Sequence, residues 1–208
     1  MNRNFVGLFV LGMFSLLFFS GCASTKILAV WRDKTYQAQP HKIMVIAILK
    51  KAAAKRFFED EFVRQIKGTG TYAFASYTVM ADAKQGDDTT IAAAMSQQGA
   101  DAVLITRQTS REAVYTYSPA CQYYPSSYYG TWRNYYLYGC QDLHSPGYVS
   151  ETEYSVMESN LYDAGKSNLV WTASSKTEVS GSDQKYFASY VSIILKNMAK
   201  AKLLPAIK

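Results

Sequence analysis

The stretch that decides the fold is KIMVIAILKKAAAKRFFEDEFVRQIKGTG, residues 42–70. Residues 43–49 form a continuous apolar run, which is typical of a strand buried on both faces of a sheet. The run gives way to apolar residues at helical spacing, and two glycines then end the helix. The stretch therefore predicts a central strand followed by an amphipathic helix that packs against the sheet. The apolar residues on that helical face are Phe58, Phe62, Val63 and Ile66.

The rest of the chain continues this alternation and then changes to an antiparallel pattern. We expect an α+β fold with one mixed sheet: strand-helix-strand-helix-strand, then an antiparallel hairpin and a C-terminal helix, in a single domain. The turn of the hairpin is DAGKSN, and the last helix begins at Ser182 or Asp183. The other expected elements are strands over 72–80, 100–117, 152–162 and 169–179, and a helix over 87–99.

The N-terminus is typical of a bacterial lipoprotein signal. Arg3 and the apolar run over 5–19 match the charged and hydrophobic regions of a signal peptide, and the run is short for a transmembrane helix. FSGC, residues 19–22, resembles the lipobox, in which the cysteine receives a diacylglycerol before cleavage. We therefore expect a signal peptide over 1–21 and diacylglycerol and palmitate on Cys22. An ordinary secretory signal with a chance cysteine is the alternative.

The residues after this cysteine favour the outer membrane. Ala23 and Ser24 follow it without an aspartate, which resembles the sorting pattern for that membrane in Gram-negative bacteria. The expected location is the periplasmic face of the outer membrane, with 22–41 as lipidated anchor and short linker and 42–208 as periplasmic α/β domain. The formal charge is +6, but in the periplasm we expect no nucleic-acid partner.

A tyrosine-rich insertion over 115–148 is the most distinctive part of the chain. Its centre is CQYYPSSYYGTWRNYYLYGC, residues 121–140. Cys121 and Cys140 remain as an even pair in an oxidising compartment, which favours a disulfide; two free buried cysteines are the alternative. The aromatic side chains cover the sheet of their own domain, form a binding surface, or do both, with alternate tyrosines pointing in and out. The candidate binding residues are Tyr123, Tyr124, Tyr128, Tyr129, Trp132, Arg133, Tyr135, Tyr136 and Tyr138.

The sequence indicates no catalytic or metal centre. His41 and His144 lie far apart, and zinc sites need clustered ligands. Asp142 and His144 precede Ser145, but DLHSPG lacks the context of a nucleophile held by a base and an oxyanion hole. We expect no enzymatic activity, no metal and no cofactor.

Two groups of carboxylates are assigned structural roles. Glu59, Asp60 and Glu61 are consecutive on the first helix and point in different directions, so we expect a solvated face on which Asp60 pairs with neighbouring arginines. Asp101 lies between a helix-ending Gly-Ala and a strand, where a turn role is expected.

Three stretches together resemble small proteobacterial envelope lipoproteins. They are residues 42–70, QQGADAVLITR at 97–107, and LYDAGKSNLVWTA at 161–173. More distantly, the arrangement is similar to penicillin-binding-protein activator lipoproteins, the N-terminal domain of TolB and the curli secretion lipoprotein. The resemblance implies a fold that binds proteins without catalytic residues. Residues 25–41 are too short to cross the peptidoglycan as the tether of the activators does.

The expected function is that of a non-enzymatic accessory lipoprotein that works by protein contact in envelope maintenance or assembly. The alternative is a glycan-binding module that recognises peptidoglycan or lipopolysaccharide sugars through the tyrosine-rich segment. The expected partners are the membrane, through the N-terminal lipid, and an envelope protein or glycan.

Replacing the lipobox cysteine tests the anchor. In Cys22→Ala we expect loss of palmitate labelling, with the protein released from the membrane fraction or retained as uncleaved precursor. The lipid is attached to that thiol, so no other residue can substitute for it. Labelling with palmitate and gel mobility of the mature form are the measurements. Unchanged labelling and normal mature mobility would contradict the assignment.

The disulfide is tested by mass. Denatured mature protein, alkylated without reductant, should carry no label at Cys121 or Cys140, and two labels after reduction. Closing a loop of about 20 residues should remove roughly 3 kcal/mol of conformational freedom from the unfolded chain. Two alkylated cysteines in the unreduced sample would disprove the crosslink.

Overall fold

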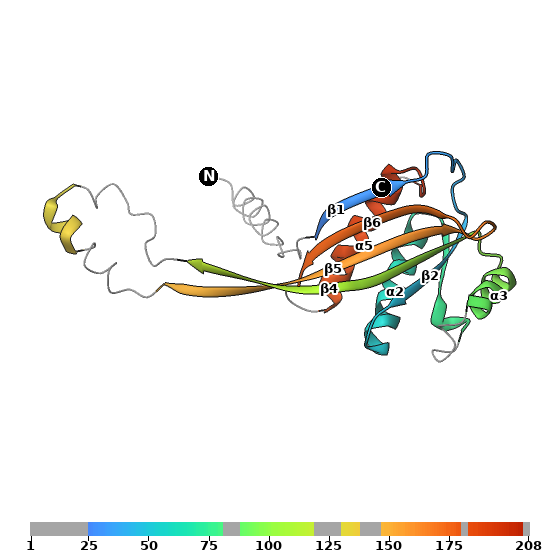
Figure 1. Cartoon of the computed structure of the whole chain (residues 1–208), viewed down its shortest axis with the longest axis horizontal. Coiled ribbons are helices and arrows are strands. Elements are labelled where there is room, and N and C mark those ends of the chain that lie inside the picture. Colours follow the sequence, from blue (N-terminus) through green and yellow to red (C-terminus); the bar gives the residue numbers. More distant parts are fainter. Residues whose placement is uncertain (1–24, 81–87, 119–129, 138–146, 180–182, 206–208) are drawn as a thin grey trace, which may run out of the picture.

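One six-stranded mixed sheet organises the molecule, in the order β1-β6-β5-β4-β2-β3 (Figure 1). The structure is a computed structural model and describes residues 25–80, 88–118, 130–137, 147–179 and 183–205. The strands are β1 (Thr25–Arg32), β2 (Lys42–Ile48), β3 (Tyr72–Ala75), β4 (Ala102–Ser118), β5 (Tyr148–Asp163) and β6 (Leu169–Glu178); the helices are α2 (Ala52–Gly68), the 3-10 turn η2 (Ser76–Thr78), α3 (Asp88–Gln98) and α5 (Asp183–Lys200).

The sheet has a parallel half and an antiparallel half, which confirms the predicted α+β class. Strand β2 lies between β3 and β4 and is parallel to both. Strands β4, β5, β6 and β1 then pair in antiparallel fashion. The apolar run of β2 is buried because it is the central strand of the parallel half.

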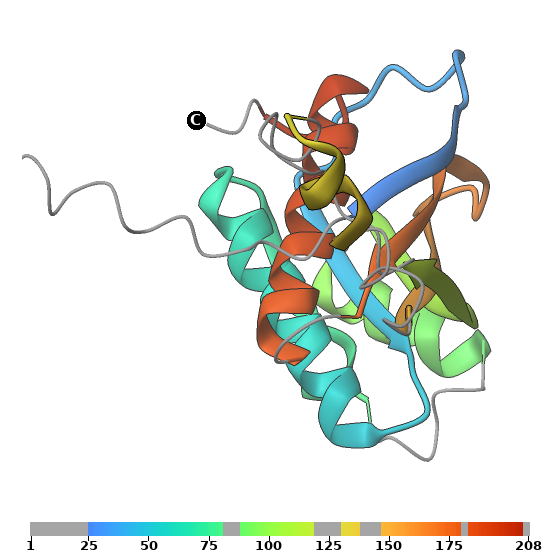
Figure 2. The ribbon, with the colours of Figure 1, turned by 90° about the vertical axis from the view of Figure 1, so that its left-hand side faces the viewer.

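Helices cover the two faces of the sheet unequally. Helices α2 and α5 lie side by side on one face (Figure 2). Phe58 of α2 stacks edge-on against Phe187 of α5, with ring centroids 4.9 Å apart, and both side chains are buried. Helix α3 packs on the other face, where Met95 joins a smaller cluster around Met44 and Val103. The main core therefore lies between the sheet and the α2–α5 pair.

A short polar chain runs through that core beneath α5. The hydroxyl groups of Thr106 and Ser159, on facing positions of β4 and β5, are 2.7 Å apart. Ser159 is also 2.7 Å from the hydroxyl of Tyr190 on α5. Burial raises the pKa of the Tyr190 phenol, which stays neutral. These bonds satisfy buried hydroxyls and fix β4, β5 and α5 relative to one another.

Two expected boundaries differ from the structure. Residues 25–32, expected as part of the linker, form edge strand β1, because their backbone pairs with β6 and Ile27 packs against the core. The strand expected over 72–80 is shorter, since β3 ends at Ala75 and the 3-10 turn follows. In that turn the Thr78 hydroxyl donates to the Ala75 carbonyl at 2.6 Å.

Glu59 departs from the expected solvated face, because its carboxylate is fully buried at the junction of α2 with the sheet. It accepts hydrogen bonds from the backbone N–H of Ala47 at 2.9 Å and from the Ser76 hydroxyl at 2.8 Å. Asp60 accepts from the Tyr77 hydroxyl, and Arg64 pairs with Glu61. The helical spacing alone did not show that β2 and the 3-10 turn bring donors to this face.

Asp101 has the structural role expected of it. Its carboxylate accepts from the backbone N–H groups of His41 at 2.7 Å and Lys42 at 2.9 Å. These bonds tie the start of β2 to the residue that precedes β4.

The buried carboxylate gives a pH prediction. Burial raises the pKa of Glu59 above its ordinary value of 4.5, against the opposing hydrogen bonds from Ala47 and Ser76. The folded state then holds the Glu59 proton more tightly than the unfolded state does. The stability that this protonation contributes is fully present below pH 4.5, and it is lost as the pH rises through the pKa of Glu59 in the folded state. A difference of one pKa unit between the folded and unfolded states corresponds to about 1.4 kcal/mol in the free energy of unfolding. Urea unfolding at several pH values should show Glu59→Gln gaining on wild type as pH rises.

Glu61→Gln is the matched control. The hydrogen bond from Arg64 lowers the pKa of Glu61, so wild type should gain on this variant as pH rises. Parallel pH profiles for wild type and Glu59→Gln would contradict the assignment.

Candidate functional site: an exposed aromatic arm

Strands β4 and β5 extend beyond the ends of the neighbouring strands and project from the body as a two-stranded ribbon (Figure 1). On one side, β2 pairs with β4 only as far as Arg107. On the other side, the backbone hydrogen bonds between β5 and the β6 segment end where the Val179 N–H donates to the Glu153 carbonyl at 2.8 Å. Beyond these points five further residue pairs continue, from Val114–Thr152 to Ser118–Tyr148. We call residues 114–118 and 148–152 the arm; it extends about 17 Å at 3.4 Å per residue.

Charged pairs mark the base of the arm. Arg111 binds Glu153 at 2.8 Å, and Lys176 of β6 binds Glu112 at 2.7 Å. Further out, the Tyr115 hydroxyl donates to the facing Glu151 at 3.3 Å. Arg111, Glu153 and Glu112 are 42–60% exposed and Lys176 is 28% exposed, so water reaches both ion pairs and each contributes about 1 kcal/mol or less.

The arm carries apolar side chains on both faces. Tyr115, Tyr117 and Val149 are 62–66% exposed and lie on one face by strand alternation. Val114 and Tyr148 lie on the other face and are also exposed. A two-stranded ribbon has no second layer to bury such side chains, and an exposed group of this kind marks an interaction site more often than an inert surface.

The glycine before β5 shapes the outer end of the arm. The phenol of Tyr117 occupies the space into which a Cβ at position 147 would project. Such a Cβ would lie 2.3 Å from the hydroxyl oxygen of Tyr117. A side chain at Gly147 would therefore displace this exposed ring.

Four of the candidate binding residues lie in the described helical turn over 132–137, which Figure 1 shows beyond the end of the arm. Trp132, Tyr135 and Tyr136 are 57–76% exposed. The Arg133 guanidinium lies 5.6 Å from the centre of the Trp132 ring. These aromatic side chains do not cover the core, so the cover alternative does not hold for them.

Several sequence predictions fall outside the described residues. They are the lipobox with Cys22, the disulfide partners Cys121 and Cys140, the candidates Tyr123, Tyr124, Tyr128, Tyr129 and Tyr138, and the group Asp142, His144 and Ser145. The binding residues predicted from the sequence do not include Tyr115, Tyr117, Tyr148 and Val149, which are all exposed. These residues alternate with polar residues, which is the pattern of any half-buried strand. They are exposed because β2 and β6 end before the arm begins, and the local sequence does not indicate where those strands end.

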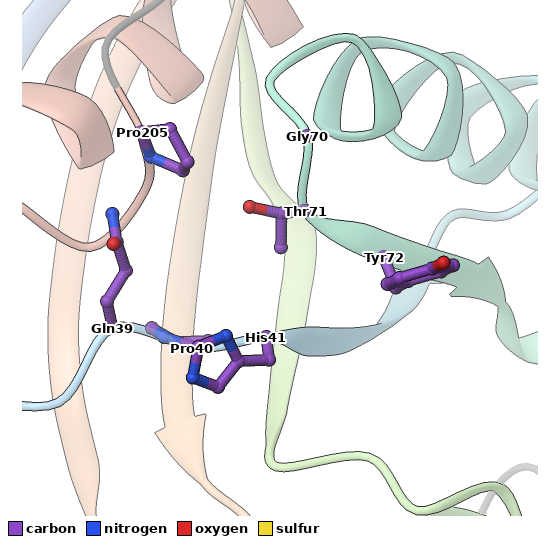
Figure 3. Close-up of a pocket in the computed structure, with 7 residues that line it drawn as sticks. All are labelled: Gln39, Pro40, His41, Gly70, Thr71, Tyr72 and Pro205. Carbon is purple, nitrogen blue, oxygen red and sulfur yellow. The ribbon is translucent and has the colours of Figure 1, made fainter.

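A small hollow lies elsewhere, at the amino ends of β2 and β3 (Figure 3). Its cavity volume is about 220 Å³. The Gln39 amide, the His41 imidazole and the Thr71 hydroxyl surround it, with Pro205 closing the side opposite β3. Ligands of parallel sheets usually bind at the opposite, carboxyl ends of the strands, so we do not regard this hollow as the main site.

Metal-ligating side chains and membrane-spanning helices were considered for the described residues, 25–80, 88–118, 130–137, 147–179 and 183–205. Within these ranges, no group of three or more His, Cys, Asp or Glu side chains is placed to hold a metal ion. The helices of the same ranges include none with the length and apolar character needed to cross a bilayer.

Comparison with known proteins gives distant structural likeness only. No family model matches the chain, and no curated protein matches it. A PelC dodecamer structure from Paraburkholderia phytofirmans is similar at 13% identity and TM-score 0.43, over 83% of this chain and 94% of that one. Lipoprotein GNA1162 from Neisseria meningitidis is similar at 16% identity and TM-score 0.41, over 77% and 99%. Because these values are low, we assign no family.

Proposed function

We propose that this chain is a non-enzymatic accessory lipoprotein, anchored to the periplasmic face of the outer membrane, that acts in envelope maintenance or assembly by holding a protein partner through its β4–β5 arm. The observation that carries the proposal is the arm itself: among the described residues it is a ribbon with two free edges and exposed aromatic side chains on its faces. The lipobox-like residues 19–22 support the anchor.

The arm suits protein contact for three physical reasons. Within the described part of the chain the edge of β4 is unpaired from Gln108 outward, so backbone N–H and C=O groups are available for an added strand. Tyrosine side chains next to this edge, such as Tyr115, supply large contact areas at a low cost in conformational entropy. The base is held by the sheet, so the contact surface is organised before a partner binds.

Site-specific crosslinking tests the proposal. A photoreactive phenylalanine at Tyr115 should form an adduct with one envelope protein in intact cells. The matched control is Tyr72, which is also exposed but lies on edge strand β3 beside the amino end of β2, whereas the arm continues from the carboxyl end of β4. The same partner should co-purify with wild type and with Tyr72→Ser, and be lost with Tyr115→Ser. Equal adducts from both positions, or co-purification unaffected by Tyr115→Ser, would refute the proposed contact.

The glycan alternative is favoured by one observation, the exposed rings of Trp132, Tyr135 and Tyr136 on the short helix. Flat, exposed aromatic rings can stack on sugars. Sedimentation of the purified protein with sacculi, lost in Trp132→Ala while crosslinking from Tyr115 is absent, would favour this function over protein contact.

A further inference from the structure

The arm and the proposed lipid anchor lie at the same end of the sheet. The first residue of β1, Thr25, pairs with Thr177 of β6, and Thr177 pairs in turn with Ser155 of β5. Ser155 faces Arg111, at the base of the arm. Figure 1 shows the same arrangement, with the start of β1 at the end of the body from which the ribbon projects. Cys22 precedes Thr25 by three residues.

The arm reaches further than the chain that leads to the anchor. Three residues span at most about 11 Å when fully extended. From the level of Arg111 to Ser118 the ladder advances seven residues, or about 24 Å. A lipid on Cys22 would thus hold the bilayer surface within about 11 Å of Thr25. The outer end of the arm extends about 24 Å beyond the same level of the sheet. With the arm directed at the membrane, its outer rows must meet the bilayer surface.

The chemistry of the outer end fits that surface. Arg133 and Asp142 are the only Lys, Arg, Asp or Glu residues in the sequence between residues 116 and 150. The exposed large side chains on the described part of this region are Tyr117, Trp132, Tyr135, Tyr136, Leu137, Tyr148 and Val149. Tyrosine and tryptophan are the residues enriched at membrane–water interfaces, where an apolar ring and a polar group can both be accommodated.

Backbone hydrogen bonding limits how deeply this end can enter. As far as the structure describes the chain, both edges of the ribbon are free beyond Val114–Thr152, and unpaired N–H and C=O groups cannot be placed in hydrocarbon without a large cost. The charged side chain of Glu151, which faces Tyr115, and the ion pair between Arg111 and Glu153 nearer the body set a second limit. The contact is therefore interfacial, at the depth of the headgroups.

We propose that the outer end of the arm, Tyr117, Tyr148, Val149 and the 132–137 helix, docks into the headgroup region of the bilayer that holds the Cys22 lipid. This inference rests on the anchor of the proposed function and assigns the bilayer to the outer rows, which leaves the inner rows around Tyr115 for a protein partner. The domain would then have two attachments to one membrane, and its orientation would be fixed.

The three tryptophans of the chain allow a direct test. Trp132 is 76% exposed beyond the arm, Trp31 is 50% exposed on β1, and Trp171 is fully buried. The full-length mature protein is reconstituted into phosphatidylcholine vesicles, with or without phosphatidylcholine brominated close to the headgroup. In Trp31→Phe, where Trp132 is the exposed reporter, brominated lipid should quench emission. In Trp132→Phe, where Trp31 is the exposed reporter, quenching should be much weaker, and Trp171 is a constant background in both.

Flotation of each variant with the vesicles separates the two proposals. Protein that fails to float would overturn the anchor, and the docking with it. Protein that floats but shows no quenching in Trp31→Phe would overturn the docking alone. Strong quenching in Trp132→Phe, with none in Trp31→Phe, would also overturn it, because the edge strand β1 and not the arm would then lie on the bilayer.

Discussion

The register of β4 against β5 is the constraint on which the rest of the molecule depends. In the inner half of the ladder Leu104 faces Leu161, and both side chains are buried. A slip of one residue would turn these side chains to the other face of the sheet, so burial fixes the pairing. The bulge between Gln108 and Ser110 then resets the alternation and increases the local twist. The faces on which the aromatic residues of the arm lie are thus decided by packing inside the domain.

The arm gains its order from continuity with the sheet. A two-stranded hairpin alone is marginally stable in water, and the ion pairs at the base are too exposed to add much. What holds the outer rows is that both strands leave a six-stranded sheet already paired and in register. The apolar side chains of these rows are consequently presented to solvent and stay available for a protein or a bilayer surface.

A second set of contacts holds the parallel half in place. Glu59 joins α2 to Ala47 of β2 and to the 3-10 turn through Ser76. Asp101 joins the start of β2 to the start of β4. Both are carboxylates that accept backbone N–H groups at places where strands begin or end, so they satisfy donors that the ladders leave unpaired. With the aromatic packing of α2 on α5, these contacts make the base from which β4 and β5 extend.

The sequence by itself determined the local elements and the class of fold, because apolar periodicity reports burial over short windows. The central strand after Lys42, the helical face around Phe62 and the C-terminal helix follow from that pattern alone. Only the tertiary structure decided that 25–32 pairs with β6, that Glu59 is buried, and that Tyr115 is exposed while similar strand positions are not. These depend on which distant segments lie alongside and where they end, and no local pattern carries that information.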